Sequence, residues 1–305
     1  MGAKECVAVE SQDSRRATGT AALLVVALAV SFQTGSALAV KVIGAVGVIE
    51  AAWLRTAFSA LLLFVLLLIV RRRALRLPPR GQRLGLVALS VCLLWMNVSF
   101  YAAIKYAPVG VVVAVEFLGP LAVAVAGTRC RVDLLWVVLA GAGVALLAGP
   151  FGSTTGKGLA LALFSGAAWA AYLLLAKRAV TDVDALSVTM YMTAGSAMLL
   201  TPLFLVSGVR FVGHEHAVAL GLVVAVVSSA LPFFLELVAL RQVRAATYGV
   251  LLSIEPGVAA VMGYVVLGQA LRPLEVVAIL AIAAAAGGAS WTSGSRRMAV
   301  DVPAI

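Results

Sequence analysis

Charge is what this sequence most lacks: Asp, Glu, Lys and Arg make up only 12% of its 305 residues. A soluble domain carries about 25% charged residues, whereas 63% of this chain is hydrophobic. The deficit predicts a protein whose solvent is largely lipid. A net charge of +10 would suit a nucleic-acid partner in a soluble protein. No basic stretch is interleaved with aromatic residues as strand binding requires, so we expect no nucleic-acid partner.

Cysteine and histidine are also scarce, with 3 Cys and 2 His in the whole chain. The cysteines show neither metal-ligand spacing nor a disulfide framework, and His214 and His216 share one loop. We therefore expect no metal and no cofactor. The sequence has no Asp-rich motif and no Ser/His pair, so no catalytic residue is expected. An integral-membrane enzyme acting on lipid remains a distant alternative.

Long apolar runs recur along the chain, each near the roughly 20 residues that cross a bilayer. They predict ten spans: 18–40, 47–70, 84–104, 109–128, 134–150, 158–178, 185–207, 215–240, 246–267 and 273–291. The connections are short, and the longest polar one, 71–83, contains six arginines. The expected fold is an all-α integral membrane bundle of ten transmembrane helices.

Basic residues are distributed unevenly between the two ends of these spans. The segments on the side of the termini hold 17 Lys and Arg, and the segments on the opposite side hold 5. Lys and Arg concentrate in cytoplasmic loops. We therefore expect a multi-pass protein of the cell (plasma) membrane with both termini in the cytoplasm.

Two stretches, 103–127 and 239–263, resemble each other at a constant spacing of 136 residues. Identical or similar residues coincide at five places: Ala103 and Ala239, Ile104 and Leu240, Lys105 and Arg241, Pro120 and Pro256, Gly127 and Gly263. The spacing contains five spans, an odd number, so the second copy would cross the membrane upside down. Such inverted repeats are common in secondary transporters. The expected parts are an N-terminal tail (1–17), two five-helix repeats (18–150 and 151–291) and a C-terminal tail (292–305).

Three glutamates are predicted to lie inside spans. A carboxylate is costly there, and each one stands close to a proline that would break its helix and free a backbone carbonyl. The pairs are Glu116 with Pro120, Glu236 with Pro232, and Glu255 with Pro256. Two interpretations stay open: a site for a proton or a substrate amine, or a carboxyl group bonded to a neighbouring helix.

Other polar and aromatic residues are expected deep in the spans. Arg55 would lie on the order of 10 Å inside the second span, where it could bind a substrate carboxylate, neutralise a glutamate or extend toward the interface. Trp95 and Trp169 fall near the middle of their spans, with Asn97 and Tyr172 close by. Aromatic walls with a few polar groups suit a small polar solute. Core packing is the alternative for each residue.

Three stretches carry a resemblance to a known family: AIKYAPVGVVVAVEFLGPL (103–121), LPFFLELVAL (231–240) and SIEPGVAAVMG (253–263). They resemble the EamA-type family of the drug/metabolite transporter superfamily, and most of all its threonine/homoserine-exporter-like branch. The resemblance implies a ten-helix bundle with a central cavity that exports amino acids or related small metabolites by antiport with protons.

By motif position, Glu116, Glu236 and Glu255 would be the acids that match the family. The family often has Leu-Gly-Glu after the last motif, where this chain has Gln269. That difference either alters coupling or concerns only an interfacial cap.

These observations predict a secondary transporter that exports small amino acids, with a small-molecule substrate, the lipid bilayer and protons as its partners. The alternative is an exporter or importer of a drug or another metabolite on the same fold. The sequence leaves open the substrate, the direction, the coupling ion and the oligomeric state.

Overall fold

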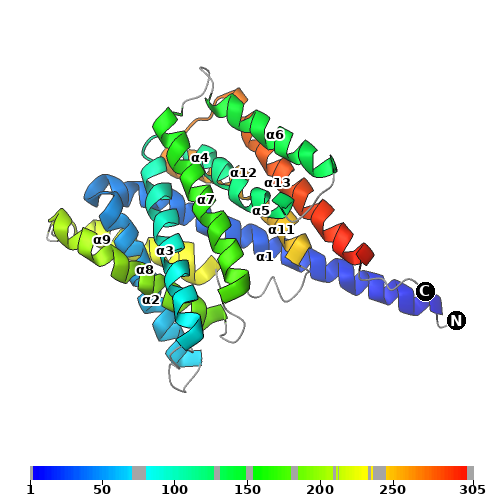
Figure 1. Ribbon diagram of the computed structural model, residues 1–305, viewed down its shortest axis with the longest axis horizontal. Helices are drawn as coiled ribbons and strands as arrows, with labels where there is room; N and C mark the ends of the chain where they lie inside the picture. The colour runs from blue at the N-terminus through cyan, green and yellow to red at the C-terminus, as the bar shows by residue number, and fades with distance from the viewer. Residues whose placement is uncertain are drawn as a thin grey trace.

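The structure is a computed structural model. It describes residues 3–70, 80–126, 131–148, 154–179, 185–208, 211, 213–232, 235 and 245–300. Within these ranges every regular element is a helix (Figure 1). The helices are α1 (Ala3–Val46), α2 (Val48–Val70), α3 (Arg80–Ala103), α4 (Val109–Glu116), α5 (Leu118–Ala126), α6 (Arg131–Ala148), α7 (Gly156–Ala179), α8 (Ala185–Ser207), α9 (Glu215–Ala225), the π-helix η1 (Val226–Ala230), α11 (Ala245–Leu252), α12 (Glu255–Leu267) and α13 (Pro273–Val300).

Among the described residues, six stretches of helix are long and apolar enough to cross a membrane. They are Ala22–Val46, Val48–Ile69, Arg80–Ala103, Gly156–Ala176, Leu186–Ser207 and Val250–Leu267. Four shorter apolar helices, Val109–Val123, Leu135–Leu147, Glu215–Ser229 and Pro273–Ala289, fall at the other four predicted spans. The chain is an integral, multi-pass membrane protein.

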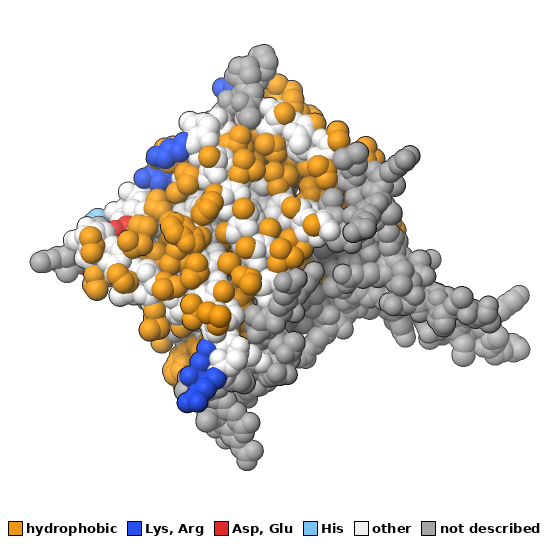
Figure 2. Space-filling model, viewed as in Figure 1, with side chains coloured by type: hydrophobic (Ala, Val, Ile, Leu, Met, Phe, Trp, Pro, Cys, Tyr) orange, Lys and Arg blue, Asp and Glu red, His pale blue; other side chains and the backbone are white. Residues whose placement is uncertain are grey.

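The surface carries large apolar side chains along whole helix faces. On α3 the exposed residues Leu84, Val87, Val91 and Trp95 recur every three or four positions, which places them on one side of the helix. Figure 2 shows a largely hydrophobic face with Lys and Arg confined to its edges. A soluble protein rarely exposes apolar area on this scale, so lipid is the natural contact of this surface.

Helices from the two halves of the chain are exchanged in the packing. α7 packs on α3, α4 and α5, whereas α1 packs on α9, η1 and α12. α2 packs on α8, and α6 packs on α13. Each half of the sequence therefore contributes one helix to the core of the other half.

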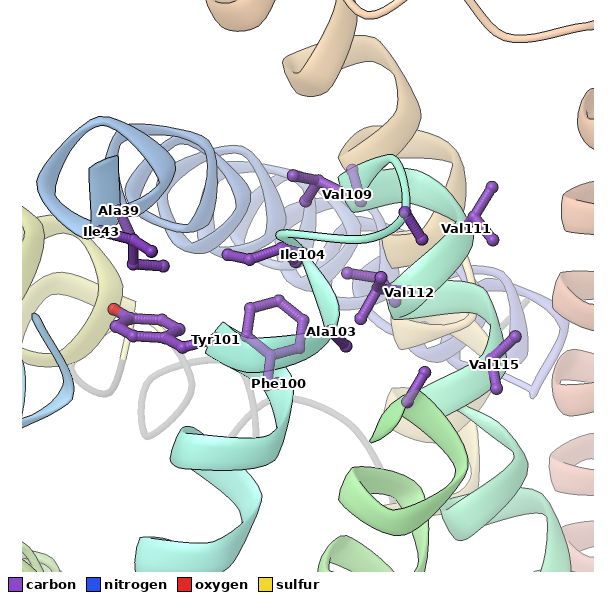
Figure 3. Packing of buried hydrophobic residues seen from close by; sticks show 14 of the residues in the cluster. Ala39, Ile43, Phe100, Tyr101, Ala103, Ile104, Val109, Val111, Val112 and Val115 are labelled. Carbon is purple, nitrogen blue, oxygen red and sulfur yellow. The ribbon is translucent and has the colours of Figure 1, made fainter. Parts of the chain in front are cut away.

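The main hydrophobic core forms where α1, α3 and α4 meet. Figure 3 shows Ala39 and Ile43 of α1 facing Tyr101 and Phe100 at the end of α3, with the valines of α4 beside them. α4 is buried on all sides, from Val109 to Val115. This helix has no polar face because it passes through the middle of the bundle.

Two short helices have equivalent bounds. α4 and α11 are both 8 residues long. The first residue of α11 lies 136 positions after the first residue of α4, and the last residues of the two helices are the same distance apart, which is the spacing of the sequence repeat. Each is followed after a short break by a second helix, α5 or α12. The predicted fourth span, 109–128, is therefore two helices rather than one, and the two helix breaks occupy matching places in the halves.

Candidate functional site

The break between α4 and α5 lies next to Glu116, the last residue of α4. Phe117 keeps a helical conformation (φ −63°, ψ −12°) and caps α4. Pro120 occupies the first turn of α5, where a proline is tolerated because the first N–H groups of a helix have no partner. Proline has no N–H, so the carbonyl of Glu116, four residues earlier, receives no helical hydrogen bond.

Two glycines bring α7 against this break. A Cβ atom on Gly166 would lie only 2.9 Å from the carbonyl oxygen of Glu116, and a Cβ on Gly119 would overlap the carbonyl of Gly166. Only a glycine at each position permits the crossing. The close approach places Ser165, the residue before Gly166, against the Glu116 side chain.

The hydroxyl of Ser165 lies 2.5 Å from Oε1 of Glu116 and 3.0 Å from the carbonyl oxygen of Met96 on α3. A hydroxyl has one proton to donate and lone pairs to accept. With a carboxylate, Ser165 donates to Glu116. With a protonated carboxyl, Glu116 can donate to Ser165, which then donates to Met96. The site can therefore hold Glu116 in either protonation state.

Arg55 of α2 is 7% exposed and lies between two aromatic rings. Its guanidinium carbon is 5.4 Å from the ring centre of Phe32 on α1 and 5.6 Å from that of Tyr101 on α3. Arg55 is close enough to Glu116 to act electrostatically on its carboxyl group, yet these two described residues form no ion pair. Its charge also acts on the buried Tyr101 hydroxyl, and a guanidinium has five N–H donors, so it can bind an anion as well.

The other predicted residues divide between this interior and the outside. Asn97 is buried on α3, four residues before Tyr101 and on the same face of the helix. Trp169 of α7 packs edge-to-face on Phe117 at 5.1 Å, beside the helix break. Trp95 is 49% exposed and makes an edge contact with Phe164 on the outer surface of α3 and α7.

Tyr172 packs in a separate cluster that joins α3, α7 and α8. It lies one helical turn beyond Trp169 along α7. Glu116 and Arg55 therefore interact electrostatically, Trp169 packs beside the helix break that holds Glu116, and Asn97 is buried on the face of α3 that carries Tyr101, whereas Trp95 lies on the outer surface.

The second break, between α11 and α12, carries Glu255 and Pro256 in the first turn of α12. Both are buried, and Glu255 is 6% exposed. Pro232 is buried immediately after η1. Glu236 lies outside the described residues.

Gln269 acts as a cap in this structure. Gly268 ends α12 in the left-handed conformation (φ 69°) that favours glycine. Oε1 of Gln269 then accepts a hydrogen bond from the backbone N–H of Val109, 3.1 Å away at the start of α4. The side chain therefore joins the end of the last motif in one half to the broken span of the other.

Ser165 is the site residue that the sequence analysis missed. A Ser-Gly pair in an apolar helix is a weak signal, because such serines usually bond their own helix. Ser90, for example, donates to the carbonyl of Leu86 at 2.8 Å. Only the approach of α7 to α4 gives Ser165 its partner.

A multi-pass bundle with a carboxyl group and a guanidinium inside broken, apolar helices has the architecture of a membrane transporter. The EamA-like transporter family matches residues 156–291. The threonine/homoserine exporter RhtA of Escherichia coli (strain K12) is 38% identical over 274 residues, which cover 88% of this chain and 90% of the relative. The chain belongs to the EamA-like transporter family of the drug/metabolite transporter superfamily.

Further comparisons agree. The threonine/homoserine exporter RhtA of Salmonella typhimurium (strain LT2) is 38% identical over 275 residues, 88% of this chain and 91% of the relative. A solved crystal structure of another protein shares 19% identity and a TM-score of 0.62 over 92% of this chain and 99% of its own, which shows a common fold. The protein is thus a transporter of small molecules rather than an enzyme.

Proposed function

We propose that this protein exports small amino acids, with threonine and homoserine as the first candidates, across the cytoplasmic membrane in exchange for protons. The observation that carries the proposal is the 38% identity to threonine/homoserine exporters over 88% of the chain. The geometry around Glu116 and Arg55 supplies a mechanism for the same function.

The two ends of a zwitterion match the two interior charges. The guanidinium of Arg55 would attract the substrate carboxylate. Glu116 would hold the substrate ammonium as a carboxylate, or carry a proton when the substrate has left. Among the described residues, Glu116 and Arg55 act on each other through their charges and not as an ion pair, so a ligand placed between them could contact both. Asn97 and Trp169 would line this path, and we assign Glu236, Glu255 and Tyr172 to the wider substrate and proton pathway.

An inverted repeat of two five-helix units would provide alternating access. The coincident bounds of α4 and α11 and the exchange of α1 and α7 between the halves support this arrangement. Pro120, Pro232 and Pro256 would mark the helix breaks at which each half changes shape. The match of the family to residues 156–291 corresponds to the second unit.

Contacts between segments support the grouping of the predicted outside segments on one side of the membrane, and the Lys and Arg bias assigns the opposite side, with both termini, to the cytoplasm. The ammonium of Lys157 donates to the hydroxyl of Tyr106 at 3.1 Å, which joins two of the five segments assigned to the outside. Phe211, in a third outside segment, stacks on Trp53 near the outer end of the second span, with ring centres 6.2 Å apart. The bond from Val109 to Gln269 connects a fourth segment to the start of α4. Segments assigned to the same side thus meet in space.

The test is transport into sealed inside-out vesicles that contain the protein. With an acidic lumen, labelled threonine should accumulate in the vesicles, and a protonophore should abolish the accumulation. Glu116→Gln should lose proton-driven accumulation but keep exchange of labelled for unlabelled threonine, since that exchange needs no net proton movement. Ser165→Ala should weaken the proton-driven mode, and the exposed Glu215→Gln serves as the control.

Two outcomes would contradict the proposal. If folded wild-type protein accumulates no amino acid, the substrate is a drug or another metabolite, and cationic compounds become the next probes. If Glu116→Gln accumulates threonine with undiminished proton dependence, Glu116 does not carry the proton, and the same experiment on Glu236→Gln follows.

A further inference from the structure

Gln33 on α1 has a buried amide without a hydrogen bond. The residue is 1% exposed, and neither its oxygen nor its nitrogen has a partner among the described residues. An amide buried in an apolar interior is unfavourable unless its donors and acceptor are paired. A retained, unpaired amide therefore indicates a group that is completed by a ligand.

The neighbours of Gln33 fix the direction in which it faces. The hydroxyl of Ser31 donates to the Val227 carbonyl of η1 at 2.6 Å, and the hydroxyl of Thr34 contacts Met262 on α12 at 3.2 Å. Phe32 lies on Arg55. Successive helix residues are about 100° apart, so Gln33 occupies the arc of α1 between the direction of Arg55 and that of α12. This arc faces the interior.

A second buried polar group accompanies it. The hydroxyl of Tyr101 is buried and makes no hydrogen bond of good geometry among the described residues, and the Arg55 guanidinium, 5.6 Å from the centre of the Tyr101 ring, acts on this hydroxyl. Figure 3 shows Tyr101 reaching toward α1 from the end of α3. Arg55 thus contacts Phe32 on α1 and Tyr101 on α3, and each of these helices carries a buried polar group close by.

Together these groups describe the ligand. Arg55 offers donors to a carboxylate. An amide has two donors and an acceptor, and a hydroxyl is the small group that can both donate to it and accept from it. The geometry points to Gln33 as the residue that selects substrates with a hydroxylated side chain, while Arg55 and Tyr101 hold the carboxylate. This inference rests on the proposed amino-acid export and names the substrate class of the same site.

Threonine and valine separate this role from general binding, because they have nearly the same shape and differ in a hydroxyl. A site that hydrogen-bonds a substrate hydroxyl disfavours the analogue that lacks it, since the polar group of the protein is then left unpaired. The wild-type protein should transport threonine in preference to valine. Gln33→Leu should lower the ratio of threonine to valine kcat/KM by about tenfold, the loss expected for one hydrogen bond.

The experiment measures initial rates of labelled threonine and valine in the same proteoliposomes. Thr34→Val is the matched control, because Thr34 is adjacent on α1 but its hydroxyl bonds the Val30 carbonyl and faces α12. It should keep the wild-type ratio. An unchanged ratio in Gln33→Leu, or equal transport of both substrates by the wild type, would overturn the inference while leaving amino-acid export intact.

Loss of all transport in Gln33→Leu is resolved by Gln33→Asn, which keeps the amide on a shorter side chain. A remaining preference for threonine in Gln33→Asn supports the assignment, and its absence refutes it. If the wild type transports neither amino acid, the proposed function itself has failed. The two failures are therefore distinguishable.

Discussion

Lys157 and Tyr106 form an exposed pair in which one charge sets the ionisation of the other. The ammonium lies 3.1 Å from the Tyr106 hydroxyl and 4.7 Å from its ring centre. The hydrogen bond from Lys157, followed by its charge, lowers the pKa of Tyr106 from its ordinary value of 10.0. The phenolate is therefore favoured in the folded protein.

This pair predicts a pH effect of definite sign. The pKa of Tyr106 is lower in the folded protein than in the unfolded chain. The ionised Tyr106 side chain therefore stabilises the folded protein at pH values above its ordinary pKa, and this stabilisation is lost as the pH falls through the lowered pKa. Lys157→Met should move the ionisation of Tyr106 to higher pH and leave its ionisation state near neutral pH unchanged. The phenolate absorbance of the protein minus that of Tyr106→Phe reports this single titration. An identical titration with and without Lys157 would contradict the prediction.

At the scale of single residues, the sequence identified the charged residues of the candidate site more readily than the uncharged polar residues around them. Glu116 and Arg55 stand out in any apolar run because ionised groups are costly in lipid. Ser165 and Gln33 carry no charge, and their importance depends on what lies opposite. Ser165 gains a carboxyl partner from α4, whereas Gln33 lacks any among the described residues. Neither fact is a property of local sequence.

At the scale of helices, α7 crosses the break between α4 and α5 at a short distance, and this close approach depends on Gly166. A methyl group on Gly166 would lie 2.9 Å from the carbonyl oxygen and 3.3 Å from the Cα of Glu116. Both are backbone atoms, so α7 must move away from α4. Gly166→Ala should lower thermal stability in detergent by about 1–3 kcal/mol and reduce transport, because Ser165 is withdrawn from Glu116.

Gly141 on α6 is the matched control for this prediction. It is also a helical glycine, but a Cβ atom there would meet no atom within 4 Å. Gly141→Ala should be neutral or stabilising by up to about 1 kcal/mol, since alanine has the better helix propensity. Equal effects of the two substitutions would show that the crossing is looser than described.

Helix breaks were only partly predictable. The prolines identified the affected spans, but the break in the fourth span falls at Phe117, before Pro120 rather than at it. Proline is accommodated in the first turn of the next helix, so the helix ends upstream of it. Gln269 could not be assigned from the sequence either, because its role depends on the N–H of Val109 in the other half of the chain.

On the scale of the whole molecule, composition and hydropathy predicted a membrane protein and the positions of its apolar helices. They did not predict that α1 and α7 would be exchanged between halves. An apolar helix such as α4 is buried all round, so its pattern does not indicate a preferred neighbour. The 136-residue repeat predicts that the halves are alike, and only the packing relates them in space.

The inverted orientation of those halves makes a prediction that a matched pair of lysines can test. Lys41 and Lys177 are 136 residues apart, and five spans separate them. If the repeat is inverted, Lys41 faces the outside and Lys177 the cytoplasm. In a protein whose three native cysteines are replaced by serine, Lys41→Cys should react with a membrane-impermeant maleimide in intact cells. Lys177→Cys should react only after the cells are permeabilised, and both variants must still transport threonine.

Labelling of both sites from the outside would mean an even number of crossings between them. In that case α4 and α11 would be parallel copies, and the alternating-access mechanism built on inverted halves would be wrong even if the substrate assignment were correct.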